Sequence, residues 1–268
     1  MKYAFMSFSC PELTLDEMLA LAKRLGYAGI EPRLCAKHQH GVEWAVDAAG
    51  RQAIRRKVAD SGTAICCLAT SCRYSDPATL AQQMEETRLA IDLAGDLGCP
   101  RLRIFGGAIP QPVSREEAIV RLGESLAALG SHAQERGVTL CLETHDAWTD
   151  PSHVAAVMQR VNHPAIGVNW DYWHPARTSG WPIQKAFDTL RPWIRHVHFH
   201  DGLLRKDQAV SRAIGTGELD SRLVLQLLQS IRYDGYLSGE WINWESHDIH
   251  LPRELAAMKR YEEELAAV

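Results

Sequence analysis

The chain has 268 residues, of which 46% are hydrophobic and 23% are charged, and its formal net charge is -4. This composition is that of a globular protein with enough apolar material to bury one substantial core. A mildly acidic chain lacks the broad basic field that attracts duplex nucleic acid or an anionic membrane. We therefore expect neither nucleic acid nor a membrane as a partner.

The beginning of the chain does not read as a targeting segment. Residues 1–19 interrupt their apolar residues with Ser7, Pro11 and Asp16, so they lack the apolar run of a signal peptide. No later run reaches transmembrane length. The seven cysteines are odd in number and form no C-x-x-C pair, which disfavours a disulfide framework and a structural zinc knuckle. We expect a cytoplasmic protein with reduced thiols, and the sequence leaves open whether the chain forms a homo-oligomer.

Short β-branched or apolar runs alternate with longer helical patterns from end to end, which is typical of repeated βα units around a parallel sheet. The expected strands are, in chain order, Tyr3–Phe8, Gly29–Pro32, Ala64–Ala69, Arg101–Phe105, Thr139–Thr144, Ile166–Trp170, His196–His200 and Tyr236–Trp241. Apolar residues spaced three and four apart predict helices between them, among them Leu15–Leu25, Leu80–Leu97, Glu116–Arg136, His153–Val161, Gln184–Leu190 and Leu223–Ile231.

Eight such units without a composition break predict an α/β fold, a single (β/α)8 TIM barrel that occupies residues 1–268 as one domain. Glycines after several expected helices, such as Gly26 and Gly98, suit the left-handed caps that turn the chain toward the next strand. The competing fold is an open doubly wound sheet. That fold usually carries a glycine-rich phosphate turn after its first strand, and residues 7–11 contain no glycine.

In a (β/α)8 barrel, the active site forms at the C-terminal ends of the strands. The last four expected strands each bring one ligand-type residue to that level, namely Glu143, Asp171, His198 and Glu240. A buried carboxylate without a cation costs several kcal/mol, and a shared metal ion removes that cost for all of them. Because this donor set is hard and mostly oxygen, it predicts one divalent ion, Mn²⁺, Mg²⁺, Co²⁺ or Zn²⁺.

Other polar residues near the mouth have less decided roles. His196, His198 and His200 alternate along one strand and therefore share a face, but only one of them need be a ligand. For His196 and His200, a hydrogen-bonded supporting role is at least as plausible. The loop histidines His38 and His40 are best read as solvated, and five tryptophans could line a pocket or pack in the core: Trp148, Trp170, Trp173, Trp241 and Trp244.

These residues resemble the xylose isomerase-like TIM-barrel superfamily, in particular its sugar phosphate isomerase/epimerase branch. The resemblance covers nearly the whole chain and is carried by motifs in a fixed order: Gly26-Tyr27-Ala28-Gly29-Ile30-Glu31, Leu142-Glu143, Asp171-x-x-His174, His196-x-His198-x-x-Asp201, Gly215-x-Gly217-x-Leu219-Asp220 and Gly239-Glu240. Singly these motifs are weak, but together they are fairly specific.

The resemblance implies that Glu143, Asp171, His198 and Glu240 are the metal ligands and that His174 contacts a small carbohydrate substrate. It also implies that Glu143 and Glu240 move a proton at the carbon beside a carbonyl, which is chemistry that two opposed carboxylates and a Lewis acid can perform. A basic residue after the seventh strand often contacts substrate in such epimerases. Arg205 or Arg212 could serve, although each is also suited to a solvated loop.

Other functions stay open on the sequence alone. A dehydratase of the inosose or dehydroshikimate type would use the same metal and base. A non-catalytic sugar-binding barrel is disfavoured by the complete ligand set. A DNA-repair endonuclease of the superfamily would need an additional Asp-x-His pair before the Gly-x-Gly turn, and Ala209 and Ser211 stand in those places.

Overall fold

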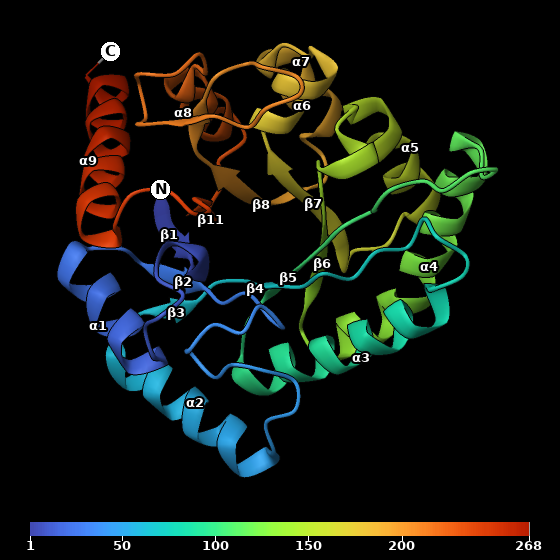
Figure 1. Ribbon diagram of the computed structural model, residues 1–268, viewed down its shortest axis with the longest axis horizontal. Coiled ribbons are helices and arrows are strands. Elements are labelled where there is room, and N and C mark those ends of the chain that lie inside the picture. Colours follow the sequence, from blue (N-terminus) through green and yellow to red (C-terminus); the bar gives the residue numbers. More distant parts are fainter. Residues whose placement is uncertain (268) are drawn as a thin grey trace.

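The structure, a computed structural model, describes residues 1–267. Figure 1 shows the strands at the centre of a ring of helices. The strands of the central sheet are β1 (Lys2–Met6), β2 (Gly29–Glu31), β3 (Ala64–Ile65), β4 (Leu68–Ala69), β5 (Arg101–Ile104), β6 (Thr139–Glu143), β7 (Ile166–Asp171), β8 (Ile194–Phe199) and β11 (Tyr236–Gly239). Every pairing between these strands is parallel. The expected α/β TIM barrel is confirmed.

The helices occupy the outside of the barrel. They are α1 (Leu15–Leu25), α2 (Ala48–Ser61), α3 (Leu80–Leu97), α4 (Arg115–Glu135), α5 (Pro151–Val161), α6 (Trp173–Ser179), α7 (Ile183–Leu190), α8 (Ser221–Ser230) and α9 (His247–Ala266). Their ends follow local chemistry. Thr14 caps α1 in a capping box with Glu17, and Gly26 closes that helix at a φ of 86°. None of the helices described in residues 1–267 is long and apolar enough to cross a membrane.

The third expected strand, Ala64–Ala69, is two short strands rather than one. Cys66 and Cys67 separate β3 from β4, and the sheet order begins at β3 and ends at β4. Residues just beyond β2 pair with β4, since the amide of Ala69 donates to Pro32 and the amide of Leu34 donates to Ala69. The barrel closes at this point because one run of chain changes its neighbour half-way along.

Several boundaries differ from the expected ones. The first strand ends at Met6, where the chain enters a 3₁₀ turn at Ser7–Ser9, and the seventh begins two residues earlier, at Ile194. Helices α2, α6 and α9 were not among the helices named from apolar spacing, although Gly62 was expected to follow a helix and does close α2. No residue of α2 is fully buried, which explains its weak apolar pattern.

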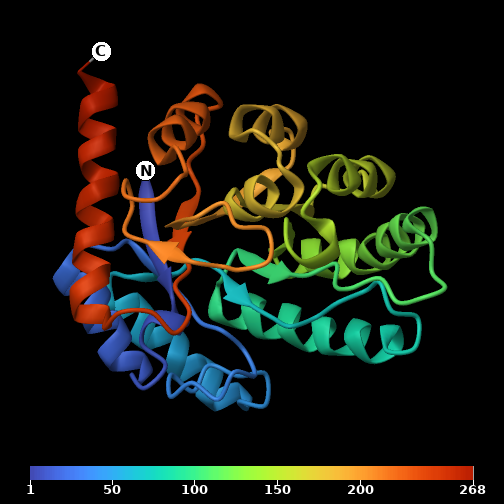
Figure 2. The same cartoon turned by 45° about the horizontal axis from the view of Figure 1, so that its top comes forward.

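A two-stranded antiparallel ribbon lies outside the barrel sheet, after β8. It consists of β9 (Asp201–Gly202) and β10 (Ser211–Arg212), and Figure 2 shows it crossing between the strands and α9. Asp201 stabilises the start and end of this ribbon. Its carboxylate accepts hydrogen bonds from four backbone N–H groups, those of Gly202, Gly215, Gly217 and Leu219. The motif residues Asp201, Gly215 and Gly217 therefore build this loop rather than the ligand cluster.

Candidate metal centre

Four buried side chains converge where four neighbouring strands end. Glu143 closes β6, Asp171 closes β7, His198 lies on β8 and Glu240 directly follows β11. Each offers one ligand-type atom, and these atoms all lie within 4.8 Å of one another. Because the four strands are consecutive in the sheet, in the order β11, β8, β7, β6, their C-terminal ends form one arc of the mouth.

His198 lies at the centre of the cluster. Its Nδ1 atom is 3.2 Å from Oε1 of Glu143 and 3.4 Å from Oε2 of Glu240. Burial alone would lower the pKa of His198, but the carboxylates of Glu31, Glu143 and Glu240 raise it well above its ordinary value. The same contact acts on Glu240: burial would raise the pKa of its carboxyl group, yet His198 lowers that pKa to about 2. Glu240 is therefore ionised at neutral pH.

Asp171 is held by backbone and by two imidazoles. Its Oδ1 accepts from the backbone N–H groups of Trp173 and His174, and its Oδ2 lies 2.8 Å from Nε2 of His200. Burial would raise the pKa of Asp171, but His200 and His174 hold it below its ordinary value. Thr144 also fixes the backbone of Asp171, because its hydroxyl donates to the carbonyl of Asp171 and accepts from the amide of Asp171.

Sequence reasoning missed two important charged groups at this site, both from the first half of the barrel. Arg103 of β5 is almost completely buried, and its Nε is 3.1 Å from Oε2 of Glu143. Glu31, the last residue of β2, contacts His198 and His196 from inside the barrel. The sequence contains a sign of each residue. Arg103 is a charged residue within an otherwise apolar strand, and Glu31 lies at the end of a strand, as the predicted ligands do.

The supporting histidines have distinct places. His200 donates from Nδ1 to the carbonyl oxygen of Glu240 and faces Asp171 with Nε2, so it connects two members of the cluster. His174, at the start of α6, has its Nε2 3.7 Å from Asp171, and its ring lies 4.3 Å from that of His145. His174 is therefore at the site, and burial lowers its pKa to about 4.

The loop histidines His38 and His40 are not simply solvated. His38 lies 2.8 Å from the hydroxyl of Ser7, and His40 is buried, with Nε2 3.2 Å from the carbonyl of Arg33. His40 accepts from the amide of Val42 at its other ring nitrogen, so it braces the chain beyond β2. The expectation of a solvated loop is wrong for His40.

Arg205 and Arg212 are the two predicted residues that the structure does not bring to the cluster. Both are exposed on the ribbon after β8. Arg205 pairs with Glu218 at 3.5 Å, and Arg212 donates to the carbonyl of its neighbour Ser211. Neither contacts the four predicted ligands in the part of the chain that the structure describes, so their substrate role stays a prediction.

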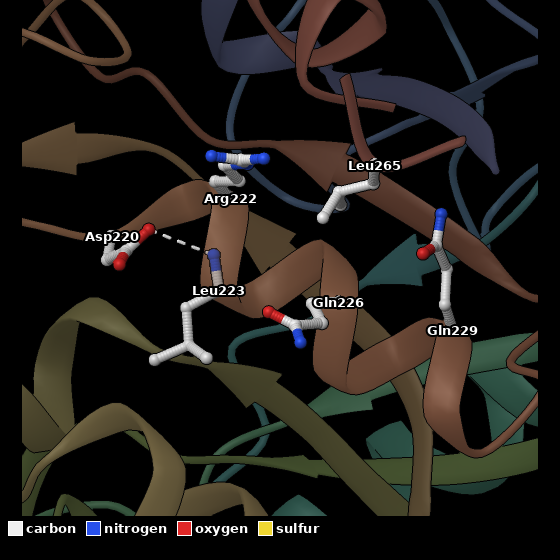
Figure 3. Close-up of a pocket in the computed structure, with 6 residues that line it drawn as sticks. All are labelled: Asp220, Arg222, Leu223, Gln226, Gln229 and Leu265. Atoms are coloured by element: carbon white, nitrogen blue, oxygen red, sulfur yellow. Dashed lines mark hydrogen bonds between the residues drawn. The ribbon is translucent and has the colours of Figure 1, made fainter. Parts of the chain in front are cut away.

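The tryptophans divide between core and mouth. Trp148, Trp170 and Trp241 are fully buried, while the ring of Trp173 packs edge-on against His200 at 4.7 Å. A cavity of about 480 Å³ lies elsewhere, on the outer surface beside α8 and the end of α9 (Figure 3). Its lining includes Asp220, Arg222 and Gln226 but none of the four clustered residues, so it has no part in their chemistry.

The cluster has the donors that a divalent ion requires. Within residues 1–267, Oε2 of Glu143 and Oδ2 of Asp171 are buried without a well-directed hydrogen-bond donor, although Arg103 and His200 approach them as ion pairs. Carboxylate oxygens left in this way and one imidazole form a hard ligand set that suits Mg²⁺, Mn²⁺, Co²⁺ or Zn²⁺. The residues present fit such an ion.

Residues 19–265 match the model of the xylose isomerase-like TIM barrel family. The chain belongs to this family. Relatives by sequence include a mouse protein named putative hydroxypyruvate isomerase, 28% identical over 182 residues. The 2-oxo-tetronate isomerase of Haemophilus influenzae is 23% identical over 172 residues. These alignments cover 62% of this chain in both cases, and 62% and 64% of the two relatives, so the chain matches less than two thirds of their length.

Solved structures with the same fold cover almost the whole chain. A probable 3-DHS dehydratase of Bacillus anthracis superposes with a TM-score of 0.80 at 19% identity, over 97% of this chain and 99% of that one. An L-ribulose 3-epimerase gives a TM-score of 0.80 at 18% identity, over 100% and 98%. At such identities the likeness concerns the fold alone.

Proposed function

We propose that this family member is a divalent-metal-dependent isomerase or epimerase of a small sugar or sugar acid, working as a single barrel domain by proton transfer at the carbon next to a carbonyl. The observation that carries the proposal is the convergence of Glu143 and Glu240. They come from β6 and from the end of β11, on either side of β7 and β8, and both approach Nδ1 of His198. Two carboxylates that face each other across one cluster can attend opposite faces of a planar intermediate.

In this mechanism one glutamate takes the proton and the other returns it. The ionised carboxylate of Glu240 can accept a proton from the carbon beside the carbonyl, and Glu143, held by Arg103, faces the same space from the other side. His174 can donate to a substrate hydroxyl from its place beside Asp171. A divalent ion held by Glu143, Asp171, His198 and Glu240 would supply Lewis-acid stabilisation of the negative charge that develops on the substrate oxygens.

Relatives named isomerase support this choice of reaction. The second candidate is a dehydratase, which would abstract the same proton and then lose water from the next carbon. The same cluster would serve it, because Glu143 and Glu240 are placed to take that proton in either reaction, and the superposition on a probable 3-DHS dehydratase extends only to the fold. An endonuclease is not favoured, since Ala209 and Ser211 occupy the ribbon after β8, where that class needs ligands.

The decisive experiment measures exchange of substrate hydrogen with solvent deuterium. A panel of ketoses, sugar acids, inososes and dehydroshikimate is incubated with Mn²⁺-loaded protein in D₂O. An isomerase incorporates label at the carbon beside the carbonyl and yields an isomer, whereas a dehydratase yields an unsaturated product. Glu240→Gln and Glu143→Gln keep one coordinating oxygen but remove the basic charge, so each should lower turnover by a factor on the order of 100 or more.

Two results would contradict the proposal. One is turnover without label incorporation together with near-normal rates of both Gln variants, which would require a hydride shift or another base. The other is the absence of bound metal by elemental analysis after Mn²⁺ loading and gel filtration.

A further inference from the structure

Glu31 lies inside the barrel below the cluster and is in contact with two histidines of β8. It is completely buried, and both of its carboxylate oxygens are occupied. Oε1 is 3.1 Å from Nε2 of His198, and Oε2 is 2.8 Å from Nε2 of His196. Both imidazoles can donate to Glu31 at the same time only when it is a carboxylate, because a carboxylate accepts hydrogen bonds through both oxygens.

The contact with Glu31 determines how the ring of His198 is oriented. Because a carboxylate accepts, Nε2 of His198 must carry a proton and donate it to Glu31. The other ring nitrogen, Nδ1, then points to Glu143 and Glu240 at 3.2 and 3.4 Å. A histidine that donates one N–H to a carboxylate presents its second nitrogen to a metal ion in a fixed direction and with greater basicity.

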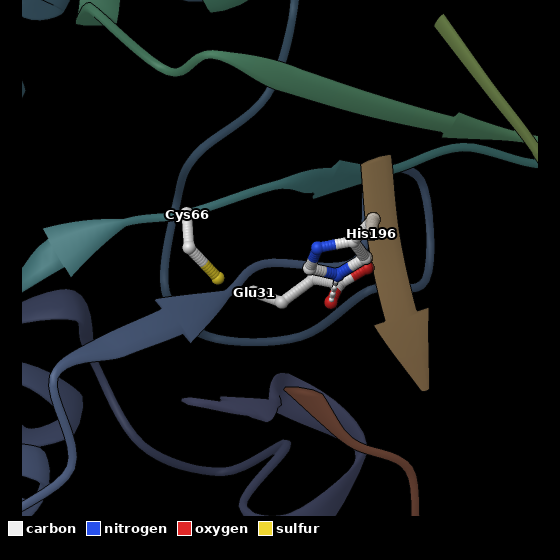
Figure 4. A group of neighbouring side chains, drawn as sticks. All are labelled: Glu31, Cys66 and His196. Atoms are coloured by element: carbon white, nitrogen blue, oxygen red, sulfur yellow. Dashed lines mark hydrogen bonds and ion pairs between the residues drawn. The ribbon is translucent and has the colours of Figure 1, made fainter. Parts of the chain in front are cut away.

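His196 provides the second support. It lies two residues before His198 on the same face of β8, so its ring reaches the other oxygen of the same carboxylate. In residues 1–267, Nδ1 of His196 is buried without a hydrogen-bond partner, so the contact with Glu31 is its principal polar interaction. Figure 4 shows the ring of His196 beside the carboxylate of Glu31, so His196 is placed to hold Glu31.

We propose that Glu31 is the positioning residue of the metal centre: it holds the imidazole of His198 with Nδ1 turned toward the other three ligands, and His196 holds Glu31. This inference rests on the proposed function, because it concerns a ligand of the proposed ion. It extends that function to a residue of β2, in the first half of the chain, whose side-chain hydrogen-bond partners among residues 1–267 are His196 and His198 and not the three carboxylates.

A second ion held by Glu31 itself is the alternative use of this place, since Glu31, Cys66 and His196 each offer a ligand-type atom and these atoms lie within 4.8 Å of one another (Figure 4). Three hydrogen bonds disfavour it. Both oxygens of Glu31 already accept from imidazole N–H groups, and the thiol of Cys66 donates to the carbonyl of Ile30 at 3.4 Å. Burial also raises the pKa of Cys66 well above its ordinary value, which opposes the thiolate that a metal would need.

The first test measures Mn²⁺ affinity in three proteins at one pH and salt concentration. In Glu31→Gln the dissociation constant should rise on the order of 10- to 100-fold, because the amide cannot accept from both rings. The matched control is Glu254→Gln, the same chemical change at another completely buried glutamate, which accepts from the amide of Ile214 on the outer side of the barrel. The control should keep its affinity within about twofold, whether or not it loses stability.

The second measurement reads the hydrogen bond directly. In the wild type, ¹⁵N-edited NMR should show a protonated Nε2 of His198 shifted downfield, and this resonance should be lost in Glu31→Gln and retained in Glu254→Gln. The absorption spectrum of bound Co²⁺ should change in Glu31→Gln alone, because the ring of one ligand has turned. A purely structural role for Glu31 would lower stability without moving either signal.

If Glu31→Gln fails to fold, His196→Gln leaves the carboxylate in place and removes its support. Its dissociation constant should then exceed that of the Glu254→Gln control, and equality with the control would overturn the inference. Unchanged affinity in a folded Glu31→Gln would overturn it too, while the proposed function would stand. A wild type that binds two ions and loses one on Cys66→Ala would make Glu31 a ligand rather than a positioning residue. A wild type without any bound ion would instead reject the proposed function.

Discussion

Arg103 shows how much the site depends on one cation from outside the ligand set. Its guanidinium is buried, lies over the ring of Phe105 at 3.9 Å, and pairs with Glu143 at 3.1 Å. Its Nη1 also donates to the carbonyl of Thr70, the residue that follows β4. Removing a partner from a buried ion pair costs more than the pair itself contributes, because a charge stays behind unpaired.

We therefore expect Arg103→Met to lower the free energy of unfolding of the metal-free protein by about 3 to 5 kcal/mol. Saturating Mn²⁺ should recover part of this loss, because the ion replaces the missing cation beside Glu143. Urea unfolding with and without the ion measures both quantities. Arg103→Lys keeps a charge and serves as the control. Equal stability of Arg103→Met and wild type in chelator would show that Glu143 has another counter-charge.

The residues that sequence reasoning found and missed differ in one respect. Four residues lie at or near the ends of expected strands, namely Glu143, Asp171, His198 and Glu240. Their positions along the strands were enough to predict that they lie together, and the structure brings them together. Arg103 was passed over because it lies one residue inside its strand, and Glu31 because its two histidine partners are 165 and 167 residues away along the chain. Contacts between residues so far apart along the chain form only when the barrel closes, and no local sequence pattern predicts them.

At the scale of elements, the ribbon after β8 depends on one glycine. A Cβ atom at Gly217 would lie 2.1 Å from Oδ1 of Asp201, the atom that accepts from the amides of Gly202 and Leu219. Real Cβ atoms do not come so close, so a side chain there must displace either Asp201 or the turn.

Gly217→Ala should therefore destabilise the loop by about 2 kcal/mol and raise hydrogen exchange in residues 203–219, with the barrel strands unaffected. Hydrogen exchange followed by mass spectrometry is the measurement. Thr216→Ala, which removes one exposed hydroxyl contact to Ala213 in the same turn, should have a much smaller effect. Uniform exchange in both variants would mean that Asp201 does not organise the loop.

Helix α9 carries a buried histidine with an unusual environment. His250 is completely buried against the rings of Trp241 and Trp244, and neither of its ring nitrogens has a hydrogen-bond partner among residues 1–267. Burial first, and then the charges of Arg253 and His247 against that of Glu245, lower its pKa from 6.5 to about 4. Folded protein thus keeps His250 neutral where the unfolded chain would protonate it.

The unfolded state binds the extra proton between about pH 6.5 and pH 4, so stability from His250 is full above pH 6.5 and is lost as the pH falls toward 4. His250→Phe should remove up to about 3 kcal/mol of this acid sensitivity. Urea unfolding at pH 7 and pH 4.5 measures it as a difference between variant and wild type. The same difference at both pH values would contradict the assignment.

The sequence predicted the rhythm of strands and helices better than their exact ends. Amphipathic helices such as α1 and α8 have strong apolar faces and were expected, whereas α2 buries no residue completely and gave no such pattern. The division of Ala64–Ala69 into β3 and β4 was equally invisible, because it arises where the sheet closes on itself. Closure is a property of the whole barrel.

For the whole molecule, an ion that binds only the folded barrel must stabilise it. At about 100 times the dissociation constant, a single bound ion adds roughly 2.7 kcal/mol to the free energy of unfolding. For a chain of this size, Tm should rise on the order of 5 °C. Calorimetry in Mn²⁺ and in chelator provides the measurement, and His198→Ala should abolish the shift while the metal-free variant stays folded. An equal shift in the variant would place the ion elsewhere.

The charges of the mouth are divided between the two halves of the chain. All four clustered residues belong to β6, β7, β8 and the end of β11, whereas Arg103 and Glu31 come from β5 and β2. If the later strands assemble before β5 has docked, three carboxylates come together without the guanidinium of Arg103 beside them. Their mutual repulsion opposes that intermediate, and a divalent ion relieves it. The ion proposed for the chemistry would then also favour the assembly of the second half of the barrel.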